Sequence, residues 1–132
     1  MQLFDCTDDE DLVNERRRLY KGKDGFIVCV ATSDQKAWSQ LKKWKEEIEQ
    51  QCPNAPMFHV LTKNDLVEFT KEPITTEMLH EKEKTMDFEG AFSTSTLEEK
   101  SESVHTAFVK AIALTYYHKY EEELYAESSH SK

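Results

Sequence analysis

Glycine is scarce in this chain, since its 132 residues include only three, at positions 22, 25 and 90. Neither G-x-x-x-x-G-K-[ST] nor G-x-G-x-x-G can be written from glycines at these positions. In those motifs, closely approaching backbone N–H groups cradle the phosphates of a nucleotide. The sequence therefore lacks the usual phosphate-binding loops.

Three other scarcities narrow the class of protein. The three cysteines cannot all pair with one another, so we expect reduced thiols and a cytoplasmic location. There is no run of about 18 apolar residues, and the N-terminus has neither a basic start nor an apolar core, so we expect neither a membrane span nor secretion. Lys and Arg number 17 against 26 Asp and Glu, and the resulting net charge of −9 argues against nucleic acid as the main ligand.

Apolar residues are sufficient for one folded domain. They make up 38% of the chain, and four short apolar segments have strand character. The run 25–31 is continuously apolar and β-branched, which is typical of a strand buried on both faces. A second strand is predicted at 56–61, and shorter ones at 2–6 and 90–93.

Helical patterns lie between these strands. One helix is predicted to begin at Ser33 or Asp34 and to run to about Gln51, where Cys52-Pro53 stops it. Its apolar face carries five residues at helical spacing, namely Ala37, Trp38, Leu41, Trp44 and Ile48.

Three further helices have recognisable starts or periods. Thr7 and Glu10 have the spacing of a capping box and open a polar segment that reaches Tyr20. Thr75 caps another helix. Apolar residues at 3.6-residue spacing predict a long last helix through 104–115, extending toward Tyr125.

The order of these elements predicts the fold class. Strands that alternate with crossover helices indicate an α/β fold with three layers, in which helices cover both faces of a mainly parallel sheet of about four to five strands. We expect one domain over 1–125 and a polar C-terminal tail over 126–132 that frays. Ligands of such folds bind at the carboxyl ends of the strands, here residues 7–9, 32–35, 62–65 and 93–97.

Two of these strand ends carry residues suited to guanine. Asp65 can accept two parallel hydrogen bonds from the ring N–H and the exocyclic amine, while the stem of Lys63 covers the face of the base. The segment 93–97 follows the next strand and offers backbone N–H groups for the keto oxygen.

The chain resembles a small GTPase of the Ras superfamily, of Rab or Rho type. The resemblance is carried, in order, by Phe4-Asp5-Cys6-Thr7-Asp8-Asp9-Glu10, Leu19-Tyr20-Lys21-Gly22-Lys23-Asp24-Gly25-Phe26-Ile27, Trp44-Lys45-Glu46-Glu47-Ile48, Cys52-Pro53-Asn54-Ala55-Pro56, Thr62-Lys63-Asn64-Asp65-Leu66, Pro73-Ile74-Thr75-Thr76-Glu77 and Ser93-Thr94-Ser95-Thr96. The resemblance implies GTP or GDP and Mg²⁺ as cofactors and protein partners. It implies guanine binding by Thr62, Lys63, Asp65, Ser95 and Thr96, and an association of Asp5 with Mg²⁺.

The departures from the family pattern concern phosphate and catalysis. Asp8 stands where the pattern has the Gly of DxxG, Asp9 stands at the position of the catalytic Gln, and Thr62 replaces the Asn of NKxD. The first strand, the P-loop and the switch that precede Phe4 in the family have no counterpart in this sequence. There is no cysteine near the C-terminus for a prenyl anchor, so we expect no membrane anchor in this chain. No catalytic residue is assigned, and whether the chain is an enzyme stays open.

Two functions remain in competition. The first is a degenerate, pseudo-GTPase domain that binds proteins and holds guanine nucleotide weakly or not at all. The second is a GTP-binding switch with residual GTPase activity. A third class, the phosphoacceptor receiver domain, is disfavoured because Lys63 is followed by Asn64 where such domains have Pro. Without phosphate contacts, Lys63 and Asp65 are also readily interpreted as a solvated loop pair.

Overall fold

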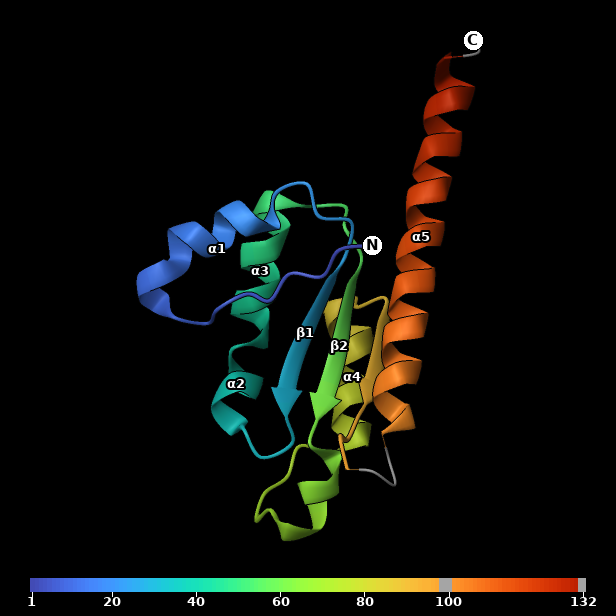
Figure 1. The fold of residues 1–132 in the computed structure, drawn as a ribbon. Coiled ribbons are helices and arrows are strands. Elements are labelled where there is room, and N and C mark those ends of the chain that lie inside the picture. The colour runs from blue at the N-terminus through green and yellow to red at the C-terminus, as the bar shows by residue number, and fades with distance from the viewer. Residues whose placement is uncertain (98–100, 131–132) are drawn as a thin grey trace.

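A parallel sheet of three strands forms the centre of the protein (Figure 1). The computed structural model describes residues 1–97 and 101–130. The strands follow one another across the sheet in the order β1 (Phe26–Ala31), β2 (Met57–Thr62) and β3 (Gly90–Ser93). The helical elements are η1 (Glu10–Leu12), α1 (Val13–Tyr20), α2 (Gln35–Ser39), α3 (Leu41–Gln51), η2 (Asn64–Phe69), α4 (Thr76–Met86) and α5 (Glu102–His130).

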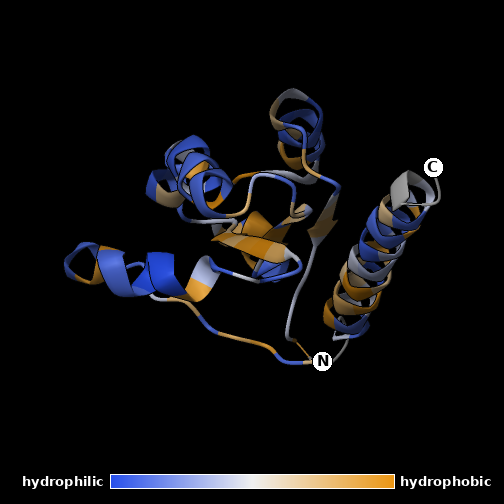
Figure 2. Ribbon diagram, turned by 90° about the horizontal axis from the view of Figure 1, so that it is seen from above, coloured by the Kyte–Doolittle hydropathy of each residue, from blue (hydrophilic) through white to orange (hydrophobic). Residues whose placement is uncertain are grey.

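The predicted α/β class is confirmed, with fewer strands than expected. All strand pairs are parallel, and helices surround the sheet (Figures 1 and 2). The strand predicted over Gln2–Cys6 is wrong, because these residues are exposed and carry no strand structure. Arg16 Nη1 donates to the carbonyl oxygens of Thr7 and Asp9, at 3.3 and 3.2 Å, and so ties the end of this segment to α1 instead of the sheet.

The core lies mainly on the face of the sheet that packs against α2, α3 and α4. The strand register pairs Val30 with Leu61, and both side chains are buried with Leu41, Ile74 and Leu79. A second cluster on the same face joins Tyr20, Ile48, Met57 and Phe88. Trp38, from the apolar face of the predicted helix, stacks on His59 of β2 with ring centroids 5.5 Å apart.

Strand β1 departs from its predicted burial. Its sequence suits a strand covered on both faces, but only Val30 is fully buried and Cys29 is exposed. The reason is position, since β1 is at the edge of the three-stranded sheet and its neighbour on one side is β2.

The helix predicted from Ser33 or Asp34 to Gln51 is two helices. Asp34 caps α2, with its Oδ1 accepting from the N–H of Ala37 at 2.9 Å. Helix α2 ends because the N–H of Gln40 turns back to the carbonyl of Ala37, and α3 then begins at Leu41. Leu41 is buried although the backbone bends just before it, so the apolar residues of α2 and α3 still face the core together.

The N-terminal cap is also placed differently from the prediction. Thr7 Oγ1 accepts from the N–H of Asp9 in a short turn, and Asp9 caps η1 by accepting from Asp11. Glu10 reaches across to Lys43, with Oε1 and Nζ 2.8 Å apart, instead of closing a capping box. By contrast, Thr75 caps α4 as predicted, its Oγ1 accepting from Met78 at 3.3 Å.

Helix α5 packs beside β3 and then continues well past the sheet (Figure 1). Its buried residues are Ala107 and Ala111, whereas residues 119–128 are all exposed. The helix continues to His130 through most of the segment expected to fray. Within the described residues, no helix is long and apolar enough to cross a membrane.

Candidate functional site

The carboxyl ends of β2 and β3 bring together the residues predicted to read guanine. Ser95 Oγ donates to Asp65 Oδ1 at 2.7 Å, and the N–H of Asn64 donates to the carbonyl of Thr94 at 3.0 Å. Thr94 and Ser95 are buried, which fixes the loop after β3 against the loop after β2. The other carboxylate oxygen of Asp65 remains an acceptor without a recorded partner among the described residues.

Lys63 is held in an unusual backbone conformation. Its φ of 55° and ψ of 36° are left-handed, and it directly precedes η2. A residue with a side chain adopts this conformation at a cost of about 1 to 2 kcal/mol, so the surrounding structure must impose it. Thr62, the preceding residue, ends β2 and accepts a backbone hydrogen bond from Thr32 at 3.0 Å.

Most backbone N–H groups of the loop after β3 already have acceptors. The N–H of Thr94 donates to the carbonyl of Leu61, that of Ser95 to Ser103 Oγ at 3.0 Å, and that of Leu97 to Ser95 Oγ at 3.2 Å. Thr96 is exposed, and in the described parts of the chain its N–H has no recorded acceptor. Among residues 94–97, the N–H of Thr96 therefore differs from its three neighbours in having no recorded acceptor.

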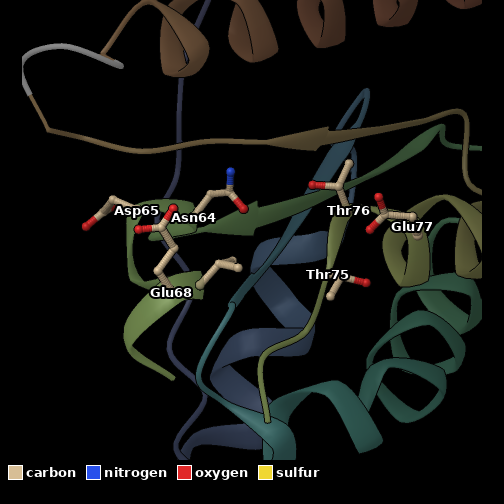
Figure 3. Close-up of a pocket in the computed structure, with 7 residues that line it drawn as sticks. Asn64, Asp65, Glu68, Thr75, Thr76 and Glu77 are labelled. Atoms are coloured by element: carbon tan, nitrogen blue, oxygen red, sulfur yellow. The ribbon is translucent and has the colours of Figure 1, made fainter. Parts of the chain in front are cut away.

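A pocket of about 340 Å³ opens beside Asp65, between η2 and the N-terminus of α4 (Figure 3). Its lining combines three carboxylates with two hydroxyls, an amide and a valine: Asp65, Glu68, Glu77, Thr75, Thr76, Asn64 and Val67. The lining contains no Lys or Arg. The pocket thus suits a neutral, hydrogen-bonding group and repels a polyphosphate.

The acidic N-terminal segment is held elsewhere, against α1 and α3. Besides its bonds to Thr7 and Asp9, Arg16 forms a buried ion pair with Glu47, and Tyr20 donates to the same carboxylate at 2.8 Å. The hydrogen bond from Arg16 holds the pKa of Glu47 below its ordinary value despite burial. Arg16 also stacks over Trp44, 4.6 Å from the ring centroid.

The candidate Mg²⁺-associated residue Asp5 lies in this exposed segment. Its negative charge raises the pKa values of the Cys6 and Cys29 thiols, an effect smaller than that of desolvation. Among residues 1–97 and 101–130, no group of three His, Cys, Asp or Glu side chains is placed to hold a metal ion. The role of Asp5 stays a prediction.

Sequence reasoning missed two features of this site. Ser103, at the start of α5, accepts from Ser95, and a lone serine in a polar stretch gives no signal of that contact. Glu68 and Glu77 enter the pocket because η2 and α4 converge there, which local sequence does not encode. Thr75 was recognised only as a cap.

Comparisons with known proteins identify the family of the chain. The model of the Ras family matches residues 1–117. The Rho-related GTP-binding protein RhoE of Homo sapiens is 36% identical over 67 residues, as are its counterparts from Sus scrofa and Mus musculus. Each match covers 50% of this chain and 28% of the relative, so the chain spans less than a third of the length of these proteins. The chain belongs to the Ras family of small GTPase-like proteins.

Proposed function

We propose that this chain is a pseudo-GTPase: a small-GTPase-like domain of the cytoplasm that binds proteins and holds guanine nucleotide weakly or not at all. Ras-family proteins in general bind GTP or GDP together with Mg²⁺ and contact protein effectors. The observation that carries the proposal is the charge of the candidate site. Its pocket presents three carboxylates and no cation, a poor environment for phosphates.

The residues suited to the guanine base keep more of the family pattern than the residues at the phosphate-facing positions. Asp65 keeps one acceptor oxygen, Ser95 orients the carboxylate, and the exposed Lys63 follows the end of β2. These contacts support weak binding of the guanine base, in which Asp65 accepts from the ring N–H and amine while Thr96 donates to the keto oxygen. If bound, Mg²⁺ would supply charge neutralisation at the phosphates, and Asp5 is the residue proposed to associate with it.

The phosphate-facing positions of the family pattern argue in the same direction. Asp8 and Asp9 replace residues that would donate to the γ-phosphate or position water. Asp9 is instead a helix cap, and its carbonyl oxygen is bound by Arg16. A negatively charged segment fixed in this way favours a structural role over a catalytic one.

Protein binding is proposed for the projecting half of α5. Tyr116, Tyr117 and Tyr120 are each at least half exposed on a helix that extends beyond the sheet (Figure 1). Tyrosine contributes a large contact area with a polar tip, which is typical of residues that dominate protein interfaces.

Calorimetric titration with GDP and Mg²⁺ tests the nucleotide part of the proposal. We expect no binding tighter than a Kd of about 1 μM. Micromolar or tighter binding that Asp65→Ala removes would support the alternative function, a GTP-binding switch.

Crosslinking of the wild type and of two variants to a partner protein tests the proposed protein binding by α5. The Tyr116→Ser/Tyr120→Ser variant is compared with Glu121→Ser/Glu123→Ser, which changes the same exposed helix without removing aromatic area. A partner identified by mass spectrometry is expected with the wild type and the glutamate variant, and is expected to be lost with the tyrosine variant. Equal capture by all three proteins would contradict docking on α5.

A further inference from the structure

Helix α5 carries apolar residues on two opposite sides. One side is covered by the rest of the domain, since Ala107 and Ala111 are buried. Thr115 lies on the same side, and a Cβ on Gly25 would be 2.6 Å from its Oγ1. A residue about two and a half turns further along a helix lies on the opposite side. The residues in that relation to the three covered ones are Tyr116, Tyr120 and Leu124.

The side that faces away from the sheet forms a continuous apolar surface. We call it the outward stripe, and it consists of Val109, Ala113, Tyr116, Tyr117, Tyr120 and Leu124. Its large side chains are between 46% and 70% exposed, and Ala113 is exposed as well. The stripe extends over about 22 Å, from beside the sheet into the projecting half of α5 (Figure 1). A helix that is apolar on opposite sides is normally covered on both, so this stripe is suited to a partner.

The outward stripe is separate from the flank of α5 that faces β1. Lys119 marks that flank, because its Nζ lies 3.3 Å from Oδ1 of Asp24, just before β1. Lys119 is the residue before Tyr120 and lies about a quarter turn away from it. A strand added to the sheet beside β1 would meet this flank and leave the centre of the outward stripe uncovered. The partner of the stripe therefore approaches from outside the sheet.

The charges beside the stripe favour one orientation of a second α5. Residues 121–123 form an acidic run at the C-terminal end of the stripe, whereas Lys110 lies near its other end. Two parallel copies would place the acidic run against itself. Two antiparallel copies place it against residues 110–112 of the second copy, which include Lys110 and no acidic residue.

The sizes of the side chains fit the antiparallel arrangement. When a two-fold axis passes between Tyr116 and Tyr117, Ala113 of each copy lies opposite Tyr120 of the other. A small residue then faces a large one, and the axis repeats this contact at both ends. The outward stripe is therefore complementary to itself.

The same register brings opposite charges together. Lys110 and Glu121 lie on the same flank of the stripe, and both are exposed. In the antiparallel pair they come within about 3 Å of each other along the helix axis, once on each side of the two-fold axis. The two pairs offset part of the repulsion between two chains of net charge −9.

We propose that the outward stripe of α5 is a homodimer interface, in which two copies of this chain pair their last helices in antiparallel orientation. Because the stripe faces away from the sheet, the two domains lie on opposite sides of the helix pair and do not collide. The surface is small for a dimer, so the pair dissociates on dilution. This inference rests on the proposed protein-binding function and names the partner as a second copy of the chain.

Sedimentation equilibrium of the full chain, from about 1 μM to 1 mM, tests the pairing. We expect a monomer at the low end of this range and a dimer at the high end. Tyr120→Ser is expected to raise the Kd of the dimer at least about tenfold, because its ring is buried twice in the interface. Glu122→Ser changes the opposite side of the same turn and should leave the Kd within about twofold. A wild-type chain that stays monomeric throughout overturns the proposal.

Charge reversal distinguishes the proposed register from general repulsion between acidic chains. Lys110→Glu and Glu121→Lys are each expected to raise the Kd about fivefold, because each places like charges opposite one another. The combined variant Lys110→Glu/Glu121→Lys should return to the wild-type Kd. General repulsion alone would make Glu121→Lys dimerise more tightly than the wild type, since it lowers the net negative charge, and that result would contradict the register.

Disulfide crosslinking tests the orientation of the helices. Under mild oxidation, Tyr117→Cys is expected to form a covalent dimer, because residue 117 lies beside the two-fold axis. Leu124→Cys is expected not to do so, since its two copies lie about 22 Å apart along the helices. The wild type has the same three native cysteines and serves as the control. Equal crosslinking of both variants would indicate a parallel pair and contradict the proposal.

The outcomes also separate this inference from the proposed function. If the chain is monomeric while a different protein is captured through Tyr116 and Tyr120, the homodimer is wrong and the interaction domain stands. If the dimer forms but GDP also binds tightly through Asp65, the homodimer stands and the pseudo-GTPase function fails.

Discussion

Arg16 and Glu47 form a two-pronged ion pair inside the protein, with Nε to Oε2 at 2.8 Å and Nη2 to Oε1 at 2.7 Å. Their exposed fractions are 1% and 7%, and Tyr20 completes the hydrogen bonding of the carboxylate. Because Arg16 also holds the carbonyls of Thr7 and Asp9, this pair connects the acidic N-terminal segment to α1 and α3.

Removal of one member of the Arg16–Glu47 pair should lower the stability of the fold strongly. Arg16→Met leaves Glu47 buried without its counter-charge, and we expect the free energy of unfolding in urea to fall by about 3 kcal/mol. Lys43→Met is the control. Lys43 Nζ and Glu10 Oε1 are 2.8 Å apart, about as close as the atoms of the Arg16–Glu47 pair, but these side chains are 55% and 60% exposed. The control should lose less than about 1 kcal/mol, and equal losses would contradict the account.

His59 should make stability depend on pH. It is fully buried between Trp38 and Phe88, and desolvation, with a smaller effect of Lys82, lowers its pKa to about 4. The unfolded chain binds this proton near the ordinary pKa of about 6.5, so stability is complete above that pH and falls as the pH drops toward 4, by about 3 kcal/mol in total.

His59→Leu removes this titration. Urea unfolding between pH 7 and 4 should show a smaller loss of stability in this variant than in the wild type. The exposed His105→Gln is the control and should follow the wild type. A parallel pH dependence of wild type and His59→Leu would show that His59 does not contribute.

Gly25 allows α5 to approach the start of β1. A Cβ at this position would lie 2.6 Å from Thr115 Oγ1 and 3.0 Å from its Cγ2. Gly25→Ala is therefore expected to lower the free energy of unfolding by about 1 to 3 kcal/mol. Thr115→Ala should restore part of the loss when combined with it, and additive losses in the double variant would indicate that the two residues do not meet.

Replacement of Lys63 should change stability and guanosine binding in opposite directions, because its backbone is left-handed while its side chain is predicted to cover the base. Lys63→Gly should raise stability by about 0.5 to 1 kcal/mol while weakening any binding of guanosine. Asp87, with φ 57° after α4, provides the matched control, because Asp87→Gly relieves the same conformation at a residue that does not line the pocket. If both variants leave guanosine binding unchanged, Lys63 is a solvated loop residue.

The sequence predicted the elements that local patterns specify. The strands at 25–31 and 56–61 were placed within about one residue, and the cap at Thr75 is confirmed. The rule that parallel strands end at one edge of the sheet places the segments 62–65 and 93–97 at the same edge, where the structure joins Asp65 to Ser95.

The errors arose where contacts distant in sequence decide the structure. Glu10 bonds to Lys43 on α3, which removes it from the predicted capping box. The bend at Gln40 leaves the apolar spacing of the helix unchanged, so periodicity does not detect it. Residues 2–6 have strand composition, but no neighbouring strand pairs with them, and the exposure of β1 follows from sheet order, which its apolar sequence does not encode.

The most direct test compares guanosine with GTP and Mg²⁺ in the same calorimetric titration. If the site accepts the base and repels phosphates, GTP should bind no more tightly than guanosine, because the pocket carboxylates oppose the added charge. GTP binding more than about a hundredfold tighter than guanosine would mean that the chain grips phosphate, and would contradict the pseudo-GTPase account.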